Sequence, residues 1–304
     1  MCYSDFFGKR YLLRVRIAVM LRVFLPLIIA LFVFSGCVKK TVEYGGEQPD
    51  VIYSRIISLS PSTTELLAML RQENFMVGRT ASCDMPETIR SIPIVANPRP
   101  DFELIVGLKP DLIFIDESVA NSDDLEKMKQ LGLNVKVLRI KSVDDWISTV
   151  YELGNLLLQH QPASREVDKV REAVSAVQAE NISPRPRVMV AMGESQSWVA
   201  GTKTFQADVM RASGGEYIGP DDEKFVPVNP EQIIAWNPDI VFVSDNPDAY
   251  KNIAGWKDTN AAKAGNIFRI HPNLLLRPGA RLSLMISSIR TEFVNYSKQQ
   301  RGGA

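Results

Sequence analysis

Cysteine and histidine are scarce in this sequence of 304 residues, which holds three cysteines and two histidines. Cys2 and Cys37 lie in or at the end of an apolar leader, so the rest of the chain keeps Cys83 as a lone thiol. A disulfide framework and a cysteine-based metal site are therefore excluded. A free zinc or manganese site would need about three histidines and a carboxylate in one place. His160 and His271 stand 111 residues apart, which argues against such a site.

Sequence motifs of several enzyme classes are also missing. There is no Gly-rich phosphate loop, no His-Glu metal pair and no Gly-x-Ser-x-Gly turn. Neither histidine has a motif context that would make it a base for the Cys83 thiol. Basic and acidic side chains number 35 each, so no charge excess indicates a nucleic-acid partner. We expect a protein that is not an enzyme, with a metal-dependent or hydrolytic activity as the alternative.

The first 37 residues are typical of an export signal. They hold five of the 35 basic side chains and one of the 35 acidic ones, so the remaining chain carries a net charge of −4. Residues 23–34 form an apolar run of twelve. Such a run is shorter than the roughly 20 residues that span a bilayer, but it suits the core of a signal peptide. The start could be Met1 or Met20, because Met20 is followed closely by a basic residue.

The leader ends in Ser35-Gly36-Cys37, which resembles the bacterial lipobox, although Phe34 stands where that pattern usually has Leu. The resemblance implies that Cys37 is lipidated and becomes the first residue of an exported lipoprotein, periplasmic or at the cell surface. An ordinary signal peptide, or a membrane anchor with an incidental cysteine, stays open. Residues 38–54 are polar, and we expect them to form a flexible tether.

Strands and helices are expected to alternate after the tether, which predicts a parallel sheet wrapped by helices. Ser62-Thr63-Thr64-Glu65 has the spacing of a capping box that opens a helix at Leu66. Residues 143–181 read as helical, interrupted only at Pro162, where a second helix would start. The other expected elements are strands at 56–59, 111–115, 135–140 and 187–191, and helices at 122–131 and 281–297.

An internal repeat is the most informative feature of the chain. Residues 103–114 read Glu-Leu-Ile-Val-Gly-Leu-Lys-Pro-Asp-Leu-Ile-Phe, and residues 231–242 read Glu-Gln-Ile-Ile-Ala-Trp-Asn-Pro-Asp-Ile-Val-Phe. In both segments a short helix should end before the proline and a buried strand should follow. The repeat predicts an α/β fold of two similar lobes with mainly parallel sheets, joined by one long backbone helix. The lobes would span 55–142 and 187–304, with linking helices at 143–186.

The chain resembles the helical-backbone substrate-binding proteins for cobalamin, ferric siderophores and heme. The resemblance covers residues 55 to about 297, nearly all of the mature body. Its motifs are 55–65 (Arg-Ile-Ile-Ser-Leu-Ser-Pro-Ser-Thr-Thr-Glu), 77–78, 83–86, the two repeats, 198–201 (Trp-Val-Ala-Gly), 214–216 (Gly-Gly-Glu) and 277–281 (Arg-Pro-Gly-Ala-Arg).

The resemblance implies that a metal chelate binds in the cleft between the lobes and passes to an ABC permease dimer with its ATPase. It implies a monomer that carries the chelate as cargo, with no cofactor of its own, and a stiff linker that permits only small hinge motion. It also implies that one glutamate per lobe docks onto the permease, and these map onto Glu103 and Glu231. From the sequence alone, each could equally be a first-turn acid that favours the helix dipole. A sensor lipoprotein without a permease is a further alternative.

Seven residues near expected strand ends or loops are candidate ligand contacts: Trp198, Arg277, Ser60, Ser82, Asp116, Tyr250 and Trp256. Aromatic rings could stack on a flat chelate, and the Arg277 guanidinium could pair with its carboxylates. The alternatives are that Trp198 covers core, that Arg277 forms a structural ion pair and that the serines cap helices. Asn97, Asp116 and Ser82 stand where cobalamin-binding relatives place aromatic residues. This departure favours a polar ferric chelate over a corrinoid.

Overall fold

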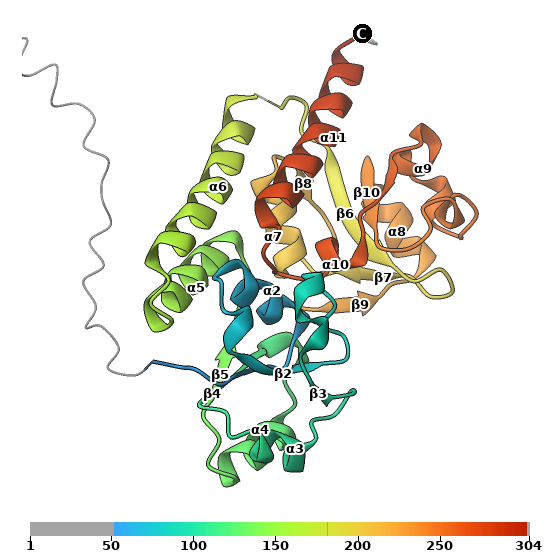
Figure 1. Ribbon diagram of the computed structural model, residues 1–304. Coiled ribbons are helices and arrows are strands. Elements are labelled where there is room, and N and C mark those ends of the chain that lie inside the picture. The colour runs from blue at the N-terminus through green and yellow to red at the C-terminus, as the bar shows by residue number, and fades with distance from the viewer. Residues whose placement is uncertain (1–51, 181, 303–304) are drawn as a thin grey trace, which may run out of the picture. The chain divides into compact units, whose positions relative to one another are not determined.

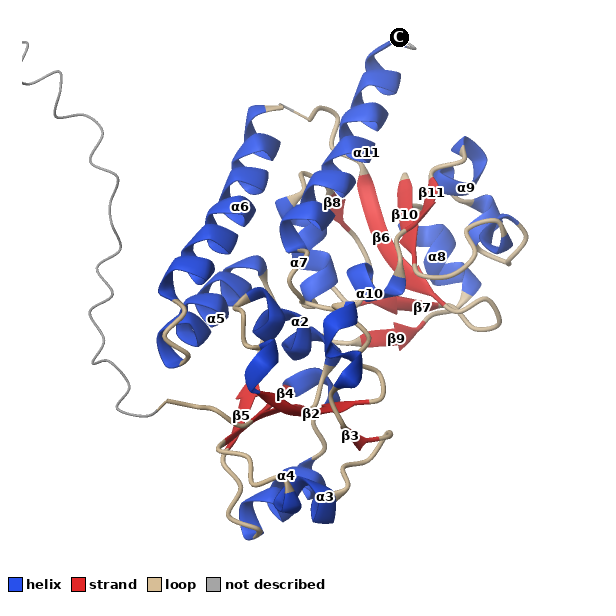
Figure 2. Cartoon of the chain, viewed as in Figure 1, coloured by secondary structure: helices blue, strands red, loops and turns tan. Residues whose placement is uncertain are grey.

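The computed structural model describes residues 52–180 and 182–302 of the chain. The expected signal peptide with Cys37 and most of the expected tether lie outside these residues. The described strands form two separate sheets, drawn in red in Figure 2. None of the helices in the described ranges is long and apolar enough to cross a membrane.

The first sheet has five parallel strands in the order β3-β2-β1-β4-β5. Figure 1 labels β2, β3, β4 and β5 among them. Its strands are β1 (Ile56–Ser58), β2 (Met76–Thr80), β3 (Ile94–Ala96), β4 (Leu112–Asp116) and β5 (Val135–Leu138). Its helices are α2 (Pro61–Met69), α3 (Phe102–Gly107) and α4 (Ser122–Gln130). Parallel strands need crossover connections, and here helices supply most of them. The predicted α/β alternation is confirmed in this lobe.

The second sheet has the order β11-β10-β6-β7-β9, and β8 also pairs with β6. Only β7 runs against its neighbours, so the sheet is mainly parallel, as predicted. Its strands are β6 (Arg187–Met192), β7 (Trp198–Ala200), β8 (Glu216–Tyr217), β9 (Phe225–Pro227), β10 (Ile240–Val243) and β11 (Ile267–Arg269). Its helices are α7 (Phe205–Ala212), α8 (Pro230–Trp236), α9 (Asn260–Ala264), α10 (Pro272–Leu275) and α11 (Leu282–Gly302).

Two helices, α5 (Val143–Leu156) and α6 (His160–Ala179), join the lobes and pack against each other. The predicted second helix is present, but the interruption lies before Pro162. The chain turns earlier, at Leu158, whose φ of 56° is left-handed, and Pro162 lies inside the first turn of α6. Proline is tolerated there because the first backbone N–H groups of a helix lack intrahelical partners. The linker is therefore a pair of helices in which α6, with 20 residues, is the longer one.

The capping box predicted at Ser62 is also absent. Helix α2 begins at Pro61, with Ser60 as its N-cap in an extended conformation and without a side-chain cap bond. Because the helix starts earlier, Ser62 lies within it, and its hydroxyl donates to the Asp116 carboxylate instead. Proline at the first helical position explains the early start, since its fixed φ already suits a helix.

Alternate side chains of the central strands point into different apolar clusters. Ile56 and Phe114 of the first lobe belong to the same continuous core as Val188 and Phe242 of the second lobe. The opposite faces of the two sheets pack in separate clusters, one under α3 and α4 and the other under α8 and α9. The continuous core also takes in residues of α2, α5, α6, α7 and α11. The lobes therefore share one interior, and the lobe boundaries taken from the sequence stay a prediction.

The two repeats form the same local structure in both lobes. Lys109 and Asn237, the residues before each proline, both have left-handed backbones, with φ of 46° and 42°. Each following aspartate then accepts hydrogen bonds from the start of the central strand of its own sheet. Asp111 Oδ2 accepts from the Arg55 amide at 3.0 Å, and Asp239 Oδ2 accepts from the Arg187 amide at 3.0 Å. The Pro-Asp pair thus ties each short helix to its sheet, which explains why the pattern occurs twice.

Candidate functional site

A cleft of about 650 Å³ lies between the lobes. Its first-lobe side comes from the segments that follow β4 and β5, at the carboxyl ends of these parallel strands, where α/β sheets commonly bind ligands. Its second-lobe side comes from the start of α7, from β9 and from the turn before α11. The lining residues are Asp116, Glu117, Ser118, Ala120, Ile140, Lys141, Thr204, Phe205, Gln206, Glu223, Lys224, Phe225, Leu276 and Pro278.

One ion pair crosses this cleft. Lys141 Nζ of the first lobe donates to Glu223 Oε2 of the second lobe at 2.7 Å. The hydrogen bond with Glu223 raises the pKa of Lys141, and the same bond lowers the pKa of Glu223. Both groups are solvent-exposed, so water and salt screen their attraction. A weak pair of this kind can be exchanged for contacts with a charged ligand.

The second-lobe wall adds apolar surface. Phe205 and Phe225 line the cleft together with Leu276 and Pro278, while Gln206 and Lys224 add polar groups. The opposing first-lobe wall is more polar, with Glu117, which pairs with Arg139, and Ser118. Both sides therefore carry charged groups, and the second-lobe side alone adds aromatic residues.

Of the seven predicted ligand contacts, Asp116 lies in this lining. It ends β4 and is almost fully buried. One of its oxygens accepts from the Ser62 hydroxyl at 2.7 Å, and the other accepts from the amide and hydroxyl of Ser118, at 2.8 and 2.7 Å. Asp116 therefore shapes the rim of the cleft by holding the turn that follows β4.

Ser60 is buried beneath this rim, so the prediction that it contacts ligand is wrong. Its Oγ lies 2.5 Å from Thr63 Oγ1 and accepts a hydrogen bond from the Asp116 amide at 3.1 Å. It therefore supports the end of β4 from within the lobe.

The predictions for Tyr250 and Trp256 are also wrong, because both rings are completely buried in the outer core of the second lobe. They pack edge to face, with centroids 5.5 Å apart. The indole of Trp256 donates to Ser197 Oγ at 2.8 Å, and the Tyr250 hydroxyl donates to Asp245. Burial raises the pKa of Tyr250. The two rings pack η4 (Ala249–Lys251) against η5 (Trp256–Asp258).

Trp198 and Ser82 are exposed, and neither belongs to the lining of the cleft. Trp198 opens β7, where 37% of its surface is accessible, and pairs across the sheet with Pro227. Ser82 lies in the loop after β2, and its carbonyl accepts from Arg277 at 3.4 Å. A ligand contact by either side chain stays a prediction.

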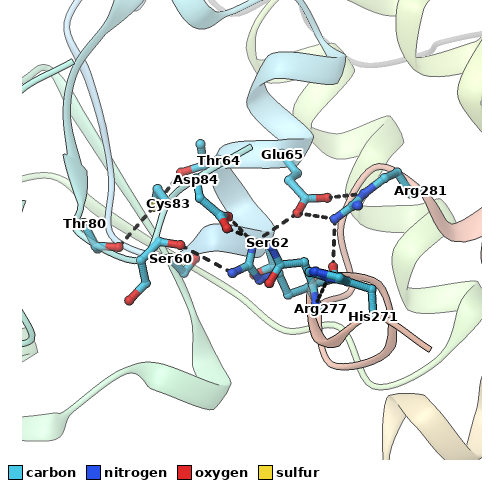
Figure 3. A network of polar contacts seen from close by, with 12 residues as sticks. Ser60, Ser62, Thr64, Glu65, Thr80, Cys83, Asp84, His271, Arg277 and Arg281 are labelled. Atoms are coloured by element: carbon cyan, nitrogen blue, oxygen red, sulfur yellow. Dashed lines mark hydrogen bonds and ion pairs between the residues drawn. The ribbon is translucent and has the colours of Figure 1, made fainter. Parts of the chain in front are cut away.

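Arg277 takes part in a structural network instead of facing the cleft (Figure 3). Its Nη1 lies 2.7 Å from Asp84 Oδ1 and 3.5 Å from Glu65 Oε1. Arg281 binds the same glutamate through two nitrogens, at 2.9 and 3.3 Å. We call Glu65, Asp84, Arg277 and Arg281 the interlobe clamp, because its acids come from the first lobe and its arginines from the second. The structural ion pair, the alternative stated for Arg277, is the one the structure contains.

The backbone beside the clamp packs closely against it. A Cβ at Gly279 would lie 2.5 Å from Glu65 Oε2, so a larger residue there would displace this carboxylate from its position between the arginines. The Gly279 carbonyl accepts from the buried indole of Trp146 at 2.9 Å, which ties the same turn to α5. Burial acts to raise the pKa of Asp84, but hydrogen bonds from Arg277 and Asn273 outweigh it, and the pKa falls below its ordinary value. The clamp is thus a preformed, paired cluster adjoining Leu276 and Pro278 of the cleft.

Cys83 lies close to the clamp without taking part in it. The thiol is buried and contacts the hydroxyls of Thr64 and Thr80 at 3.0 and 3.1 Å.

The His271 ring accepts a hydrogen bond from the Asn273 amide and so caps α10. Within residues 52–180 and 182–302, no group of three or more His, Cys, Asp or Glu side chains could hold a metal ion.

The sequence did not identify four residues of the cleft lining: Lys141, Glu223, Phe205 and Phe225. Lys141 could have been found, because it follows an expected strand, at the end where ligands bind in such sheets. Glu223 lies in an irregular stretch and Phe225 opens the short strand β9, and no local pattern there points to the cleft.

Removal of one member of the interlobe clamp should destabilise the protein. Glu65 is 4% exposed, so Glu65→Gln leaves Arg281 without its buried counter-ion, and such a loss costs about 3–5 kcal/mol. Urea unfolding would measure this loss. Glu152→Gln, which breaks the exposed Lys136–Glu152 pair, is the control and should cost about 0–1 kcal/mol. Equal stability of both variants would contradict a structural role for the clamp.

Comparison with known proteins agrees with this geometry. The model of the family described as periplasmic binding protein matches residues 56–274. An uncharacterized ABC transporter substrate-binding lipoprotein of Bacillus subtilis is 25% identical over 238 residues, which cover 75% of this chain and 76% of that protein. A vitamin B12-binding protein of Vibrio vulnificus is 25% identical over 254 residues, covering 81% and 92%.

Among solved structures, a possible iron-binding periplasmic solute-binding protein of Staphylococcus epidermidis superposes with a TM-score of 0.68. It is 26% identical, and the match covers 80% of this chain and 99% of that one. These relatives are binding proteins and not enzymes, and the two-lobed architecture is theirs as well. The chain belongs to the periplasmic binding protein family.

Proposed function

We propose that this protein is the substrate-binding component of an ABC importer, which captures a metal chelate between its lobes and delivers it to a permease dimer with its ATPase. The cleft, with Lys141 and Glu223 reaching into it from opposite lobes, is the observation that carries this proposal. The names of the relatives support it, since they include an ABC transporter substrate-binding lipoprotein and a vitamin B12-binding protein. The protein acts as a monomer and needs no cofactor of its own.

A polar ferric chelate suits the cleft better than a corrinoid or heme. The first-lobe wall offers carboxylates, a hydroxyl and the Lys141 ammonium, whereas a flat macrocycle would favour apolar and aromatic walls on both sides. On the second-lobe side the partly buried Phe225 supplies aromatic surface, whereas Phe205 is only 5% exposed. A chelate with hydrogen-bonding groups at one edge and aromatic rings at the other would match both walls.

Binding is expected to involve little lobe movement. The continuous core, the interlobe clamp and the pair α5–α6 all connect the lobes on the inner side of the cleft. Packed cores of this kind resist continuous deformation. Closure then amounts to adjustment of the cleft walls, during which ligand groups replace the exposed Lys141–Glu223 pair.

A thermal-shift screen of the purified mature protein against ferric siderophores, heme and corrinoids tests the ligand class. At a ligand concentration of 100 times the dissociation constant, binding should add about 2.7 kcal/mol of stability. We expect the largest shift with a ferric siderophore. Absence of any shift with all three classes would refute chelate capture, and a shift with a corrinoid or heme alone would correct the ligand.

The role of the cleft in that binding is tested by Lys141→Gln. We expect about a tenfold weaker chelate affinity, since loss of one charged contact costs on the order of 1.4 kcal/mol. Lys136→Gln is the matched control, because Lys136 also pairs with a glutamate but lies outside the lining. Calorimetric titration would measure both, and equal affinities would place the ligand elsewhere.

Docking to the permease is proposed to use Glu103 and Glu231. Both are exposed, each lies in the first turn of its helix, and neither forms an ion pair with the described residues. Two carboxylates at matched places on similar lobes suit a permease of two equivalent subunits. Such charges contribute to approach and register more than to raw affinity.

The double variant Glu103→Lys/Glu231→Lys should abolish uptake and leave chelate affinity unchanged. Transport of radiolabelled or fluorescent chelate into cells would measure uptake, and calorimetry would measure chelate affinity. Glu172→Lys on α6 combined with Glu180→Lys at its C-cap makes the same change of charge away from these helices and serves as the control. Normal uptake by the Glu103/Glu231 variant would remove the docking hypothesis and favour a sensor without a permease.

We also propose that the protein is exported and lipidated at Cys37. The lipid would hold it at the periplasmic or outer cell surface of its membrane. The lipobox-like Ser35-Gly36-Cys37 and the lipoprotein among the relatives support it. Cys37→Ala should move the protein from the membrane fraction to the soluble exported fraction and remove metabolically incorporated palmitate. A Cys37→Ala protein that stays in the membrane fraction would favour the membrane anchor with an incidental cysteine.

A further inference from the structure

The exposed surfaces of α3 and α8 carry a second shared feature besides their glutamates. Val106 follows Glu103 by three residues, and Ile234 follows Glu231 by three. Residues three apart lie on one face of a helix. Val106 is 44% exposed and Ile234 is 47% exposed, although both are large aliphatic side chains. Each lobe therefore presents an acid with an aliphatic side chain beside it.

The rotation of the two helices about their axes is fixed in the same way. Ile105 and Ile233, which precede the aliphatic residues, are buried in the outer cores of their lobes. Asp101 and Asn229 cap the first turns through their side chains, at 3.0 and 2.9 Å. The left-handed residues and the Pro-Asp pairs then fix the helix ends against the sheets. The buried isoleucine thus turns the glutamate and the aliphatic residue outward in both lobes.

Other exposed positions of the two helices are not shared. Leu104 corresponds to Gln232, and Gly107 corresponds to Ala235. A single exposed aliphatic residue is ordinary on a protein surface. Its occurrence at the same position in both copies, beside the same acid, is not explained by packing, because neither side chain belongs to the cores of the described residues. A partner that contacts both lobes in the same way would account for it.

We infer that Val106 and Ile234 are the apolar half of a two-part docking surface, and that each permease subunit offers an apolar socket beside the cation that receives the glutamate. This inference rests on the proposed function and names a second contact at the same surface. The charged part contributes to approach and register, whereas burial of the aliphatic side chain slows dissociation. The duplicated pair fits a two-fold partner, in which both sockets are equivalent.

The test uses the full-length lipoprotein and its permease–ATPase complex in nanodiscs, with dissociation followed by surface plasmon resonance. Each of Val106→Ser and Ile234→Ser should raise the dissociation constant about tenfold, through a faster off-rate, in line with the loss of one buried aliphatic side chain. The swap Val106→Ile/Ile234→Val should bind as the wild type does. Chelate affinity and the urea midpoint should stay unchanged in all variants.

Leu131→Ser/Leu284→Ser removes two exposed aliphatic residues elsewhere and is the matched control.

The salt dependence of binding distinguishes the charged part of the surface from the apolar part. The effect of Glu103→Gln/Glu231→Gln should fade at about 0.5 M salt, where the Debye length is only a few Å, whereas the effect of the serine variants should persist.

The possible results test the apolar contact separately from the proposed transport function. Wild-type binding by Val106→Ser/Ile234→Ser, combined with weak binding by the glutamine variant, would overturn the apolar socket and leave docking intact. Equal weakening by the Leu131/Leu284 control would also overturn it. Failure of the wild-type lipoprotein to bind the permease at all would refute the proposed function and the inference with it.

Discussion

Glu65 is the residue on which the arrangement of the lobes depends. It is almost completely buried, and two arginines from the segment before α11 neutralise it across the lobe boundary. A buried carboxylate without a partner is costly, so any movement that separates the lobes here must expose it or break the pair. The clamp therefore fixes the inner wall of the cleft at Leu276 and Pro278, and leaves adjustment to the exposed groups at its mouth.

The internal repeat provides the second constraint. Each copy ends a short helix in a left-handed residue, and the Pro-Asp pair then binds the first amide of the neighbouring central strand. The same local solution in both lobes places a short, exposed helix at matched positions. The cleft has no such symmetry, because its second-lobe wall carries two phenylalanines beside its charged residues and its first-lobe wall carries no aromatic residue. Symmetric outer surfaces with an asymmetric cleft suit a protein that meets a symmetric partner and holds an asymmetric ligand.

Local patterns located some of the predicted residues, while their roles in docking and ligand binding stay predictions. Glu103 and Glu231 came from the resemblance, which maps onto the repeat, and both are exposed on matched helices. Asp116 came from the resemblance, since it stands where cobalamin-binding proteins place an aromatic residue, and it lines the cleft. Tyr250, Trp256 and Ser60 also follow strands, but their side chains are buried, because strand ends alone do not say which side of the loop faces the core. Arg277 was correctly seen as a charged loop residue, yet its partners come from positions about 190 and 210 residues away.

The sequence by itself determined the α/β alternation, the two copies of the lobe and the likeness to a family of binding proteins. These features follow from short-range patterns, such as buried strands, proline and glycine positions and the repeated Pro-Asp pair. Only the tertiary structure decided which polar groups meet across the lobes, since Lys141 and Glu223, or Glu65 and Arg281, have no signal in the residues around them. Pairing of side chains far apart in the chain depends on how the two sheets pack on one shared core, and no local pattern encodes that geometry.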